Sequence, residues 1–397
     1  MPARGPYSNE VLVNQPKARR HVKIVCTLGP ASNSPPAIER ILTAGMNVAR
    51  LNLNYGTLEE HRRLITGIRS ISQRLKMPTG ILLDLPGLKH RKGDMKAVFS
   101  EHLEFALSQD ADFIALSFIS SAQQVKTVKE LLRKMGANIP LIVKIEQAAA
   151  LEEASAILDT GDGIMVARGD LAQEISIEKV PLAQKHLIRE ANYRGKPVIT
   201  ATQMLESMVR APTPTRAEAT DVANAVLDGS DALMLSEETA IGSYPAEAVS
   251  TMAKIVLEAE TAFPYEQRLH EKWPDMLAEV NDATARAACQ IASQVQASAI
   301  VALTNGGTTA LRVAKYRPCQ PILAVTISET IVRRLSLVWG VLPMKKMEPA
   351  NLEEVFELAR DVALETNAAR AGDLIVITAG LPLAVAGSTN LVKVHRV

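Results

Sequence analysis

The chain has 397 residues, and its 44 Lys and Arg residues almost balance its 43 Asp and Glu residues, for a net charge of +1. This balance excludes the basic surface of a nucleic-acid-binding protein, and no apolar run approaches the ~18 residues of a membrane span. The polar N-terminus lacks a signal-peptide core, and Cys26, Cys289 and Cys319 are widely spaced, so we expect a cytoplasmic protein with reduced, buried cysteines.

Eight short apolar runs, separated by stretches of helical length, occupy the first part of the chain. They are rich in Leu and β-branched residues and bounded by Gly, Pro, Asn or Asp, which is typical of strands buried on both faces. Alternating strands and helices predict parallel strands joined by crossovers, and eight units can close a (β/α)₈ TIM barrel. The predicted strands are residues 23–29, 47–53, 80–86, 113–119, 140–147, 163–170, 197–203 and 231–238.

A second domain follows a further helix near residues 245–260. Residues 261–274 lose periodicity and contain two prolines, which indicates a domain junction. We therefore expect a barrel domain over residues 1–264 and a small doubly wound α/β domain over residues 275–397. In the second domain, the predicted helices are 283–295, 310–316, 328–339 and 352–365, and the predicted strands are 299–303, 322–325, 374–378 and 391–394.

Two acidic residues end neighbouring predicted strands. The chemistry of a parallel barrel lies at the C-terminal ends of its strands, so we expect the carboxylates of Glu146 and Asp170 to converge there. Two carboxylates with open positions suit a hard divalent cation such as Mg²⁺, which retains waters and accepts substrate oxygens. The alternative is that both carboxylates cap helices.

Basic and hydroxyl residues lie at the same ends of the predicted strands. Lys144 precedes Glu146 by two residues, so both side chains point to one face, where an ammonium can meet a phosphoryl group or an enolate. A structural ion pair is the alternative. Arg50 and Arg91 would add a wall that binds phosphate in bidentate geometry, unless they are surface arginines. The Thr202 hydroxyl could contact a substrate methyl or carboxylate.

A turn rich in glycine and hydroxyl groups joins a strand to a helix in the second domain. Backbone N–H groups and hydroxyls at such a place form a ready anion site. The turn lacks the lysine of a P-loop and does not fit G-x-G-x-x-G, so a plain turn is the alternative to an effector site. Its residues are Thr304, Asn305, Gly306, Gly307, Thr308 and Thr309.

Taken together, these segments resemble the pyruvate kinase family. The resemblance covers nearly the whole chain and implies transfer of a phosphoryl group from phosphoenolpyruvate to ADP, giving pyruvate and ATP, by a homotetramer. The matching segments are residues 23–32 (KIVCTLGPAS), 45–52 (GMNVARLN), 144–146 (KIE), 164–171 (IMVARGDL), 196–207 (KPVITATQMLES), 214–218, 221–229, 234–239, 377–380 and 387–390.

The resemblance also implies roles for individual residues. Glu146 and Asp170 would hold Mg²⁺ or Mn²⁺, and Lys144 would stabilise the transferring phosphoryl group and the enolate. Arg50 would bind the phosphoryl group, and Thr202 would lie near the carbon that is protonated. The remaining matches are Arg91 as a further active-site arginine and Gly169 as a substrate-binding residue.

The monovalent-cation site departs from the pattern of the family. Many members bind K⁺ through an Asn, a Ser, an Asp and a Thr near a Glu. Asn52 and Asp84 match, but Asn54 replaces the Ser, Leu85 replaces the Thr and Lys89 stands where the Glu would be. This combination resembles the K⁺-independent branch, in which an ammonium supplies the missing charge. We expect no K⁺ requirement.

The largest departure is the absence of the lid domain that the family inserts after the third strand. Only residues 88–100 lie there, and Tyr55 replaces a His on the nucleotide side. A lid excludes water and holds the nucleotide, so its loss should affect ADP binding and phosphoryl transfer most. Three interpretations follow: a slow kinase, a barrel for pyruvate-enolate chemistry such as oxaloacetate decarboxylation, or a non-catalytic regulatory or assembly protein.

Overall fold

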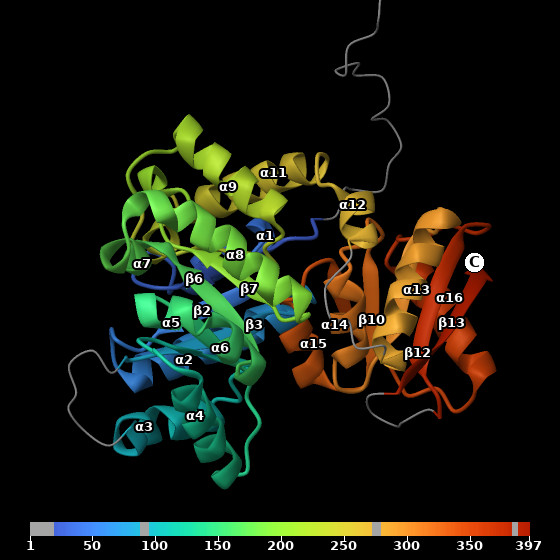
Figure 1. Cartoon of the computed structure of the whole chain (residues 1–397), viewed down its shortest axis with the longest axis horizontal. Helices are drawn as coiled ribbons and strands as arrows, with labels where there is room; N and C mark the ends of the chain where they lie inside the picture. Colours follow the sequence, from blue (N-terminus) through green and yellow to red (C-terminus); the bar gives the residue numbers. More distant parts are fainter. Residues whose placement is uncertain (1–19, 88–94, 272–278, 383–387) are drawn as a thin grey trace, which may run out of the picture.

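The computed structural model describes residues 20–87, 95–271, 279–382 and 388–397. Eight parallel strands close a barrel in the order β1 to β8, and β8 pairs with β1 (Figure 1). The predicted TIM barrel is therefore confirmed. Its strands are β1 (Lys23–Thr27), β2 (Val48–Asn52), β3 (Gly80–Leu85), β4 (Phe113–Leu116), β5 (Leu141–Ile145), β6 (Gly163–Ala167), β7 (Val198–Ala201) and β8 (Ala232–Leu235).

Helices surround the barrel, and each crossover between successive strands contains at least one. The helices are α1 (Pro35–Ala44), α2 (Leu58–Leu75), α3 (Met95–Ser108), α4 (Ala122–Lys134), α5 (Ala148–Glu152), α6 (Ala154–Thr160), α7 (Arg168–Glu174), η2 (Ile177–Lys179), α8 (Val180–Tyr193), η3 (Glu206–Val209), α9 (Arg216–Asp228), α10 (Glu237–Ala240), α11 (Pro245–Glu260) and α12 (Tyr265–His270).

Alternate residues of the strands face two different cores. Val25 and Val48 belong to the cluster inside the barrel, whereas Ile24 and Ala49 pack outward against the helices. Because both faces are covered, the strands appear as continuous apolar runs and not as alternating ones. This burial explains why the strands could be predicted from the sequence.

The second sheet has five strands in the order β11-β10-β9-β12-β13, with only β13 antiparallel to its neighbour. Buried clusters lie on both of its faces, which confirms the doubly wound α/β fold. The sequence did not predict β11, since it is an edge strand that contains Pro343 and is only partly buried. The elements are α13 (Val280–Gln294), β9 (Ala299–Leu303), α14 (Thr308–Lys315), β10 (Ile322–Thr326), α15 (Glu329–Leu335), β11 (Val341–Lys345), α16 (Leu352–Glu365), β12 (Leu374–Gly380) and β13 (Thr389–Arg396).

Several predicted boundaries were wrong. Strand β6 ends at Ala167, so Asp170 lies in the first turn of α7 and not on a strand. In this first turn of α7 the Gly169 N–H donates to the Thr202 hydroxyl, a contact between strand ends that local periodicity does not reveal. Helix α3 begins at Met95, which leaves residues 86–94 between β3 and α3, and α12 occupies part of the predicted irregular stretch 261–274.

The second domain packs against the N-terminal end of the barrel. Leu337 belongs to the apolar cluster inside the barrel, and the buried Lys23 at the start of β1 donates to the Val341 carbonyl at 2.7 Å. The Gly340 N–H donates to the His21 carbonyl at 2.9 Å. These contacts close one end of the barrel, so the C-terminal end remains for chemistry.

The structure bears on two expectations drawn from the composition, which concern the burial of the cysteines and membrane-spanning helices. Cys26 and Cys289 are buried, but Cys319 is exposed, because it sits on the surface turn between α14 and β10 and not in an element. The helices in the described ranges include none that combines the length and apolar character of a membrane span.

Candidate active site

Lys144, near the end of β5, is the centre of a polar cluster at the C-terminal end of the barrel. Its Nζ lies 2.7 Å from Glu146 Oε1 and 3.4 Å from Asp84 Oδ2, and it donates to Ser117 Oγ at 2.8 Å. The Lys144 side chain is 12% exposed, against 1% for each carboxylate. Lys144 and Glu146 therefore point to one face, as predicted. They also form the ion pair that was the alternative interpretation of Lys144.

Arg50 meets the same cluster from β2. Its Nε and Nη2 donate to Asp84 Oδ2 at 2.9 and 2.6 Å, and its Nη1 donates to Thr27 Oγ1 at 2.8 Å. The guanidinium is buried and paired with Asp84. Strands β2 and β3 are neighbours, with Asn52 opposite Asp84 in the register, which brings Arg50 within reach of that carboxylate.

Burial and charge act against each other in this cluster. Burial opposes ionisation of Asp84, but Lys144 and Arg50 outweigh it and lower the pKa of that carboxyl group. Burial also disfavours the charged Lys144, yet Asp84 and Glu146 raise its pKa above the ordinary value. For Glu146, burial dominates over Lys144 and raises the pKa. Lys144 is thus a cation and Asp84 an anion at neutral pH.

The two predicted metal ligands have unused oxygen atoms. Glu146 Oε2 accepts the Phe118 N–H at 2.7 Å, but the buried Oε1 accepts no hydrogen bond of acceptable geometry from the described residues, although Lys144 Nζ is close. Asp170 is half-buried, and no hydrogen bond or ion pair of the described residues engages its carboxylate.

These carboxylates fit a hard divalent cation better than helix capping. Neither α5 nor α7 has a side-chain cap. The described residues contain no cluster of three or more His, Cys, Asp or Glu suited to a metal, so a cation there would take two carboxylates and complete its shell with substrate and water, as Mg²⁺ does.

Thr202 directly follows β7 and has an unusual backbone. Its φ is 69°, a left-handed conformation that is an outlier for a β-branched residue. Its Oγ1 accepts the Gly169 N–H at 2.8 Å and donates to the Ala201 carbonyl at 2.7 Å. The structure thus brings the predicted residues Thr202 and Gly169 into contact, next to Asp170 on α7.

Three residues of this site were not among the predicted site residues. Ser117 joins Lys144 to Asp84, because its Oγ also donates to Asp84 Oδ1 at 3.1 Å. Phe118 has a φ of 57° and offers its N–H to Glu146, and Arg168 donates to the carbonyls of Ala201 and Thr202. All three residues lie at the ends of predicted strands, and this position was the signal in the sequence that could have identified them. Phe118, however, acts through its backbone N–H, which has no sequence signature.

The residues predicted for the monovalent-cation site are already bonded to protein groups. Asp84 pairs with two cations, and Asn52 Oδ1 accepts both the N–H and the side-chain amide of Asn54 at 3.1 and 3.0 Å. Lys89 and the predicted active-site residue Arg91 lie outside the described residues.

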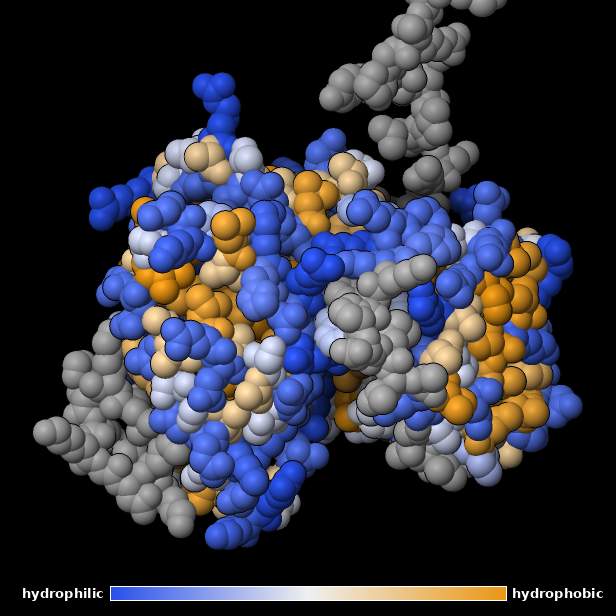
Figure 2. All heavy atoms as spheres, in the orientation of Figure 1, coloured by the Kyte–Doolittle hydropathy of each residue, from blue (hydrophilic) through white to orange (hydrophobic). Residues whose placement is uncertain are grey.

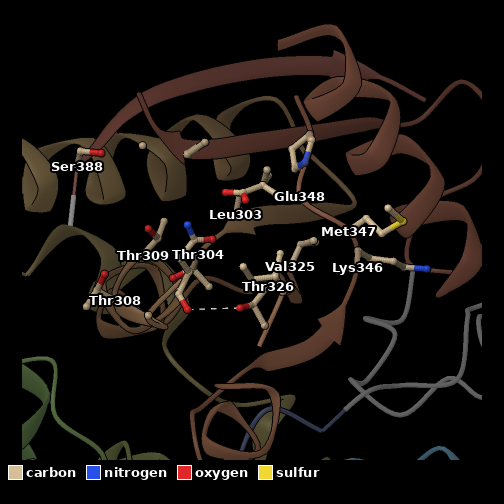
Figure 3. A pocket seen from close by; sticks show the side chains of 16 residues that line it. Leu303, Thr304, Thr308, Thr309, Val325, Thr326, Lys346, Met347, Glu348 and Ser388 are labelled. Atoms are coloured by element: carbon tan, nitrogen blue, oxygen red, sulfur yellow. Dashed lines mark hydrogen bonds between the residues drawn. The ribbon is translucent and has the colours of Figure 1, made fainter. Parts of the chain in front are cut away.

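The predicted effector loop lines a pocket in the second domain that is open to solvent (Figure 3). The loop passes from β9 to α14, and the buried Thr304 Oγ1 has no hydrogen-bond partner among the described residues. In Figure 3 the Glu348 carboxylate points into the pocket, while the Lys346 side chain points away, toward its partner Glu365.

Comparison with known proteins agrees with this geometry. The family model described as pyruvate kinase, barrel domain, matches residues 19–100 and 98–249, and the one described as pyruvate kinase, alpha/beta domain, matches residues 282–395. Pyruvate kinases of Staphylococcus aureus strains USA300, NCTC 8325 and COL are each 37% identical over 471 aligned residues, covering 95% of this chain and 80% of theirs. The two barrel matches meet near the short β3–α3 connection.

Proposed function

The chain belongs to the pyruvate kinase family and is an enzyme of that type, and from this premise we propose that it transfers the phosphoryl group of phosphoenolpyruvate to ADP at the C-terminal end of the barrel. The observation that carries the proposal is the buried cluster of Lys144, Arg50, Asp84 and Glu146. Asp170, on the helix that follows the neighbouring strand β6, has no partner for its carboxylate among the described residues.

The formal charges of this cluster suit an anionic substrate. Two cations, Arg50 and Lys144, balance two carboxylates, Asp84 and Glu146, so the buried cluster is neutral. Glu146 and Asp170 would hold Mg²⁺ or Mn²⁺, and a divalent ion outweighs the single extra charge of Asp170. The site would then be positive, which favours a phosphate ester and the charge that develops during phosphoryl transfer.

The side chains divide the remaining work. The Lys144 ammonium would stabilise the phosphoryl group in transfer and the enolate that departs from it, and Arg50 would orient the phosphoryl group. The bound cation would supply Lewis-acid neutralisation of the phosphoryl oxygens. Thr202 would hold a hydroxyl near the carbon that accepts the proton, while Gly169 leaves the backbone accessible beside it.

A missing lid should make this enzyme slow. Residues 86–94, between β3 and α3, are too few for a separate domain. Without a lid, water reaches the nucleotide side, and ADP loses contacts that would hold it. We therefore propose that the missing lid lowers the rate of phosphoryl transfer more than it weakens the binding of phosphoenolpyruvate.

The bonding of Asp84 and Asn52 supports K⁺ independence. Both groups that match the family's cation site already have partners from the chain itself, so a monovalent cation would have to displace them. The predicted ammonium substitute, Lys89, would supply the charge in its place.

We expect pyruvate to form from phosphoenolpyruvate and ADP with Mg²⁺ at the same rate with K⁺ or with tetramethylammonium. Chelation of Mg²⁺ should abolish turnover, and Glu146→Gln should weaken the response to Mg²⁺ because one ligand loses its charge. The measurement is pyruvate formation in a coupled assay, with oxaloacetate decarboxylation followed in parallel. Decarboxylation without kinase turnover would favour enolate chemistry, and neither reaction would favour a non-catalytic role.

We also propose that the loop Thr304–Thr309 binds a phosphorylated effector, supported by the unpaired Thr304 hydroxyl and the α14 N-terminus in one pocket. Inorganic phosphate should raise the Tm of the wild type by more than the Tm of Thr308→Asp, since the added carboxylate repels the anion from the loop. Thr220→Asp, on the exposed face of α9, should respond like wild type. An equal phosphate response of the Thr308 variant would leave the loop as a plain turn.

We also propose that the two domains extend over residues 1–264 and 275–397. We further propose that the protein is a cytoplasmic homotetramer. Ile177 and Leu182 are 71% and 70% exposed on η2 and α8, and β13 lies at the free edge of its sheet. Figure 2 shows apolar side chains gathered over the second domain, in the region of α13, α16 and β13. Exposed apolar patches mark association surfaces, and light scattering tests whether the mass is four times 42.9 kDa.

A further inference from the structure

The backbone at the end of β7 is held in a conformation that the sequence does not favour. Thr202 and Gln203 have φ values of 69° and 54°. In the left-handed region Cβ crowds the carbonyl oxygen, and a β-branched residue is rarely found there. Such a conformation persists only where the surrounding structure imposes it. Contacts from outside β7 must therefore hold Thr202.

Arg168, the first residue of α7, makes those contacts. Its Nη2 donates to the Thr202 carbonyl at 2.6 Å, and its Nε donates to the Ala201 carbonyl at 3.2 Å. These two carbonyl groups flank Thr202 on its N- and C-terminal sides. Because the guanidinium is a rigid planar fork, bonding both carbonyls restricts φ and ψ of Thr202 together.

The guanidinium is itself anchored from a third element. Its Nη1 donates to both carboxylate oxygens of Asp221 on α9, at 2.8 and 2.6 Å. The Arg168 side chain is only 11% exposed, whereas that of Asp221 is 38% exposed, so the guanidinium is largely shielded from water and the carboxylate is not. Arg168 thus links β7 to α9, and it cannot follow a movement of the Thr202 loop without breaking this ion pair.

The residue after Arg168 fixes the Thr202 hydroxyl. The Gly169 N–H donates to Thr202 Oγ1, and that hydroxyl donates to the Ala201 carbonyl. The start of α7 therefore controls both the backbone and the side chain of Thr202. A hydroxyl that must stay near a reacting carbon benefits from such constraint, since small misplacements are costly in catalysis.

We propose that Arg168 is a positioning residue that, anchored by Asp221, keeps the Thr202 hydroxyl at the C-terminal end of the barrel. Arg168 touches neither the Lys144 cluster nor the metal ligands through any described contact, and it acts through Thr202. The effect of Arg168 on catalysis rests on the proposed function, whereas its effect on the backbone conformation of Thr202 does not.

The conformational test uses crystal structures of Arg168→Met and Arg168→Lys. We expect Thr202 to leave the left-handed region in Arg168→Met and to shift in Arg168→Lys, because a lysine cannot bond both carbonyls and Asp221 in one plane. The matched control is Arg194→Met, which removes an arginine paired with Asp159 and Glu190. Arg194 precedes β7, whereas Thr202 follows it, so this change should leave Thr202 unchanged. An unchanged Thr202 φ in both Arg168 variants would overturn the proposal.

The catalytic test is a double-mutant cycle. Arg168→Lys should lower kcat about 100-fold, whereas Arg194→Met should not lower it. In a Thr202→Ala background the Arg168 change should cost far less, because the group through which it acts is gone. Additive losses would contradict the proposal. A wild type without turnover would instead refute the proposed function, and the crystal structures would still decide the role of Arg168.

Discussion

Lys144→Met is expected to lower kcat for phosphoryl transfer by about 100- to 1,000-fold, the loss typical for removal of one group that stabilises transition-state charge. The Lys144 ammonium lies within 2.7 to 3.4 Å of Glu146, Ser117 and Asp84. Its removal changes the buried cluster from neutral to a net charge of −1. With Asp170 and a bound divalent cation, the site falls from positive to neutral. It therefore attracts phosphoenolpyruvate less and lacks the ammonium that would stabilise the developing enolate.

A second lysine ion pair provides the matched control for this variant. Lys129 on α4 pairs with Asp162 at 2.8 Å, and Asp162 precedes β6 at the opposite, N-terminal end of the barrel. Lys129→Met should leave kcat within about twofold of wild type, since ion pairs of this kind contribute little. The measurement is kcat and KM in the coupled assay, with near-UV circular dichroism as a check on folding. A folded Lys144→Met enzyme with wild-type kcat would refute the assignment of the site.

Removal of Asp231 alone, as Asp231→Leu, is expected to lower the free energy of unfolding by about 3 to 5 kcal/mol. Asp231, immediately before β8, pairs with Arg317 of the second domain at 2.8 and 2.9 Å, and each side chain is 4% exposed. Arg317 also donates to the Gly229 carbonyl at 3.0 Å and to Asn192. A buried guanidinium without its counter-ion explains the size of the loss.

A double variant separates the unpaired buried charge from the other contacts of Asp231 and Arg317. Asp231→Leu combined with Arg317→Met should cost less than the two single changes added together, because no unpaired charge stays buried. As a control, the exposed pair Arg74 and Glu39, at 2.8 Å, should cost less than about 1 kcal/mol when either partner is removed. Urea unfolding under reducing conditions measures all of these. Additive losses at Asp231 and Arg317 would contradict a coupled interdomain pair.

Strand periodicity predicted the barrel, and chemistry at the strand ends proposed most residues of its candidate site. Lys144 lies on β5 and Glu146, two residues further on, directly follows that strand, so their common face follows from the pleat and needs no tertiary information. Asp170 is different. The sequence placed it on a strand, but β6 ends at Ala167 and α7 begins at Arg168, where Gly169 bonds Thr202, 33 residues away.

The edge strand β11 and the backbone donor of Phe118 could not be predicted from the sequence, for a different reason. Strand β11 contains a proline and is half-exposed, so it carries neither the apolar run of a buried strand nor a clean alternation. The Phe118 N–H that bonds Glu146 depends on a positive φ, and the identity of the residue says nothing about it. Local sequence patterns report burial and spacing, not the direction of a backbone amide.

The sequence alone determined that this chain builds an eight-unit barrel and a second α/β domain, that its acidic and basic side chains follow the strands, and that no lid lies between β3 and α3. Each of these follows from neighbouring residues, through the periodicity of the strands, the spacing of the polar residues and the length of the connections. The tertiary structure decided that Arg50 bonds Asp84, that Leu337 fills the barrel interior, and that Arg168 holds Thr202. These contacts join residues far apart in the chain, so they depend on how the elements pack and which rotamers the packing allows.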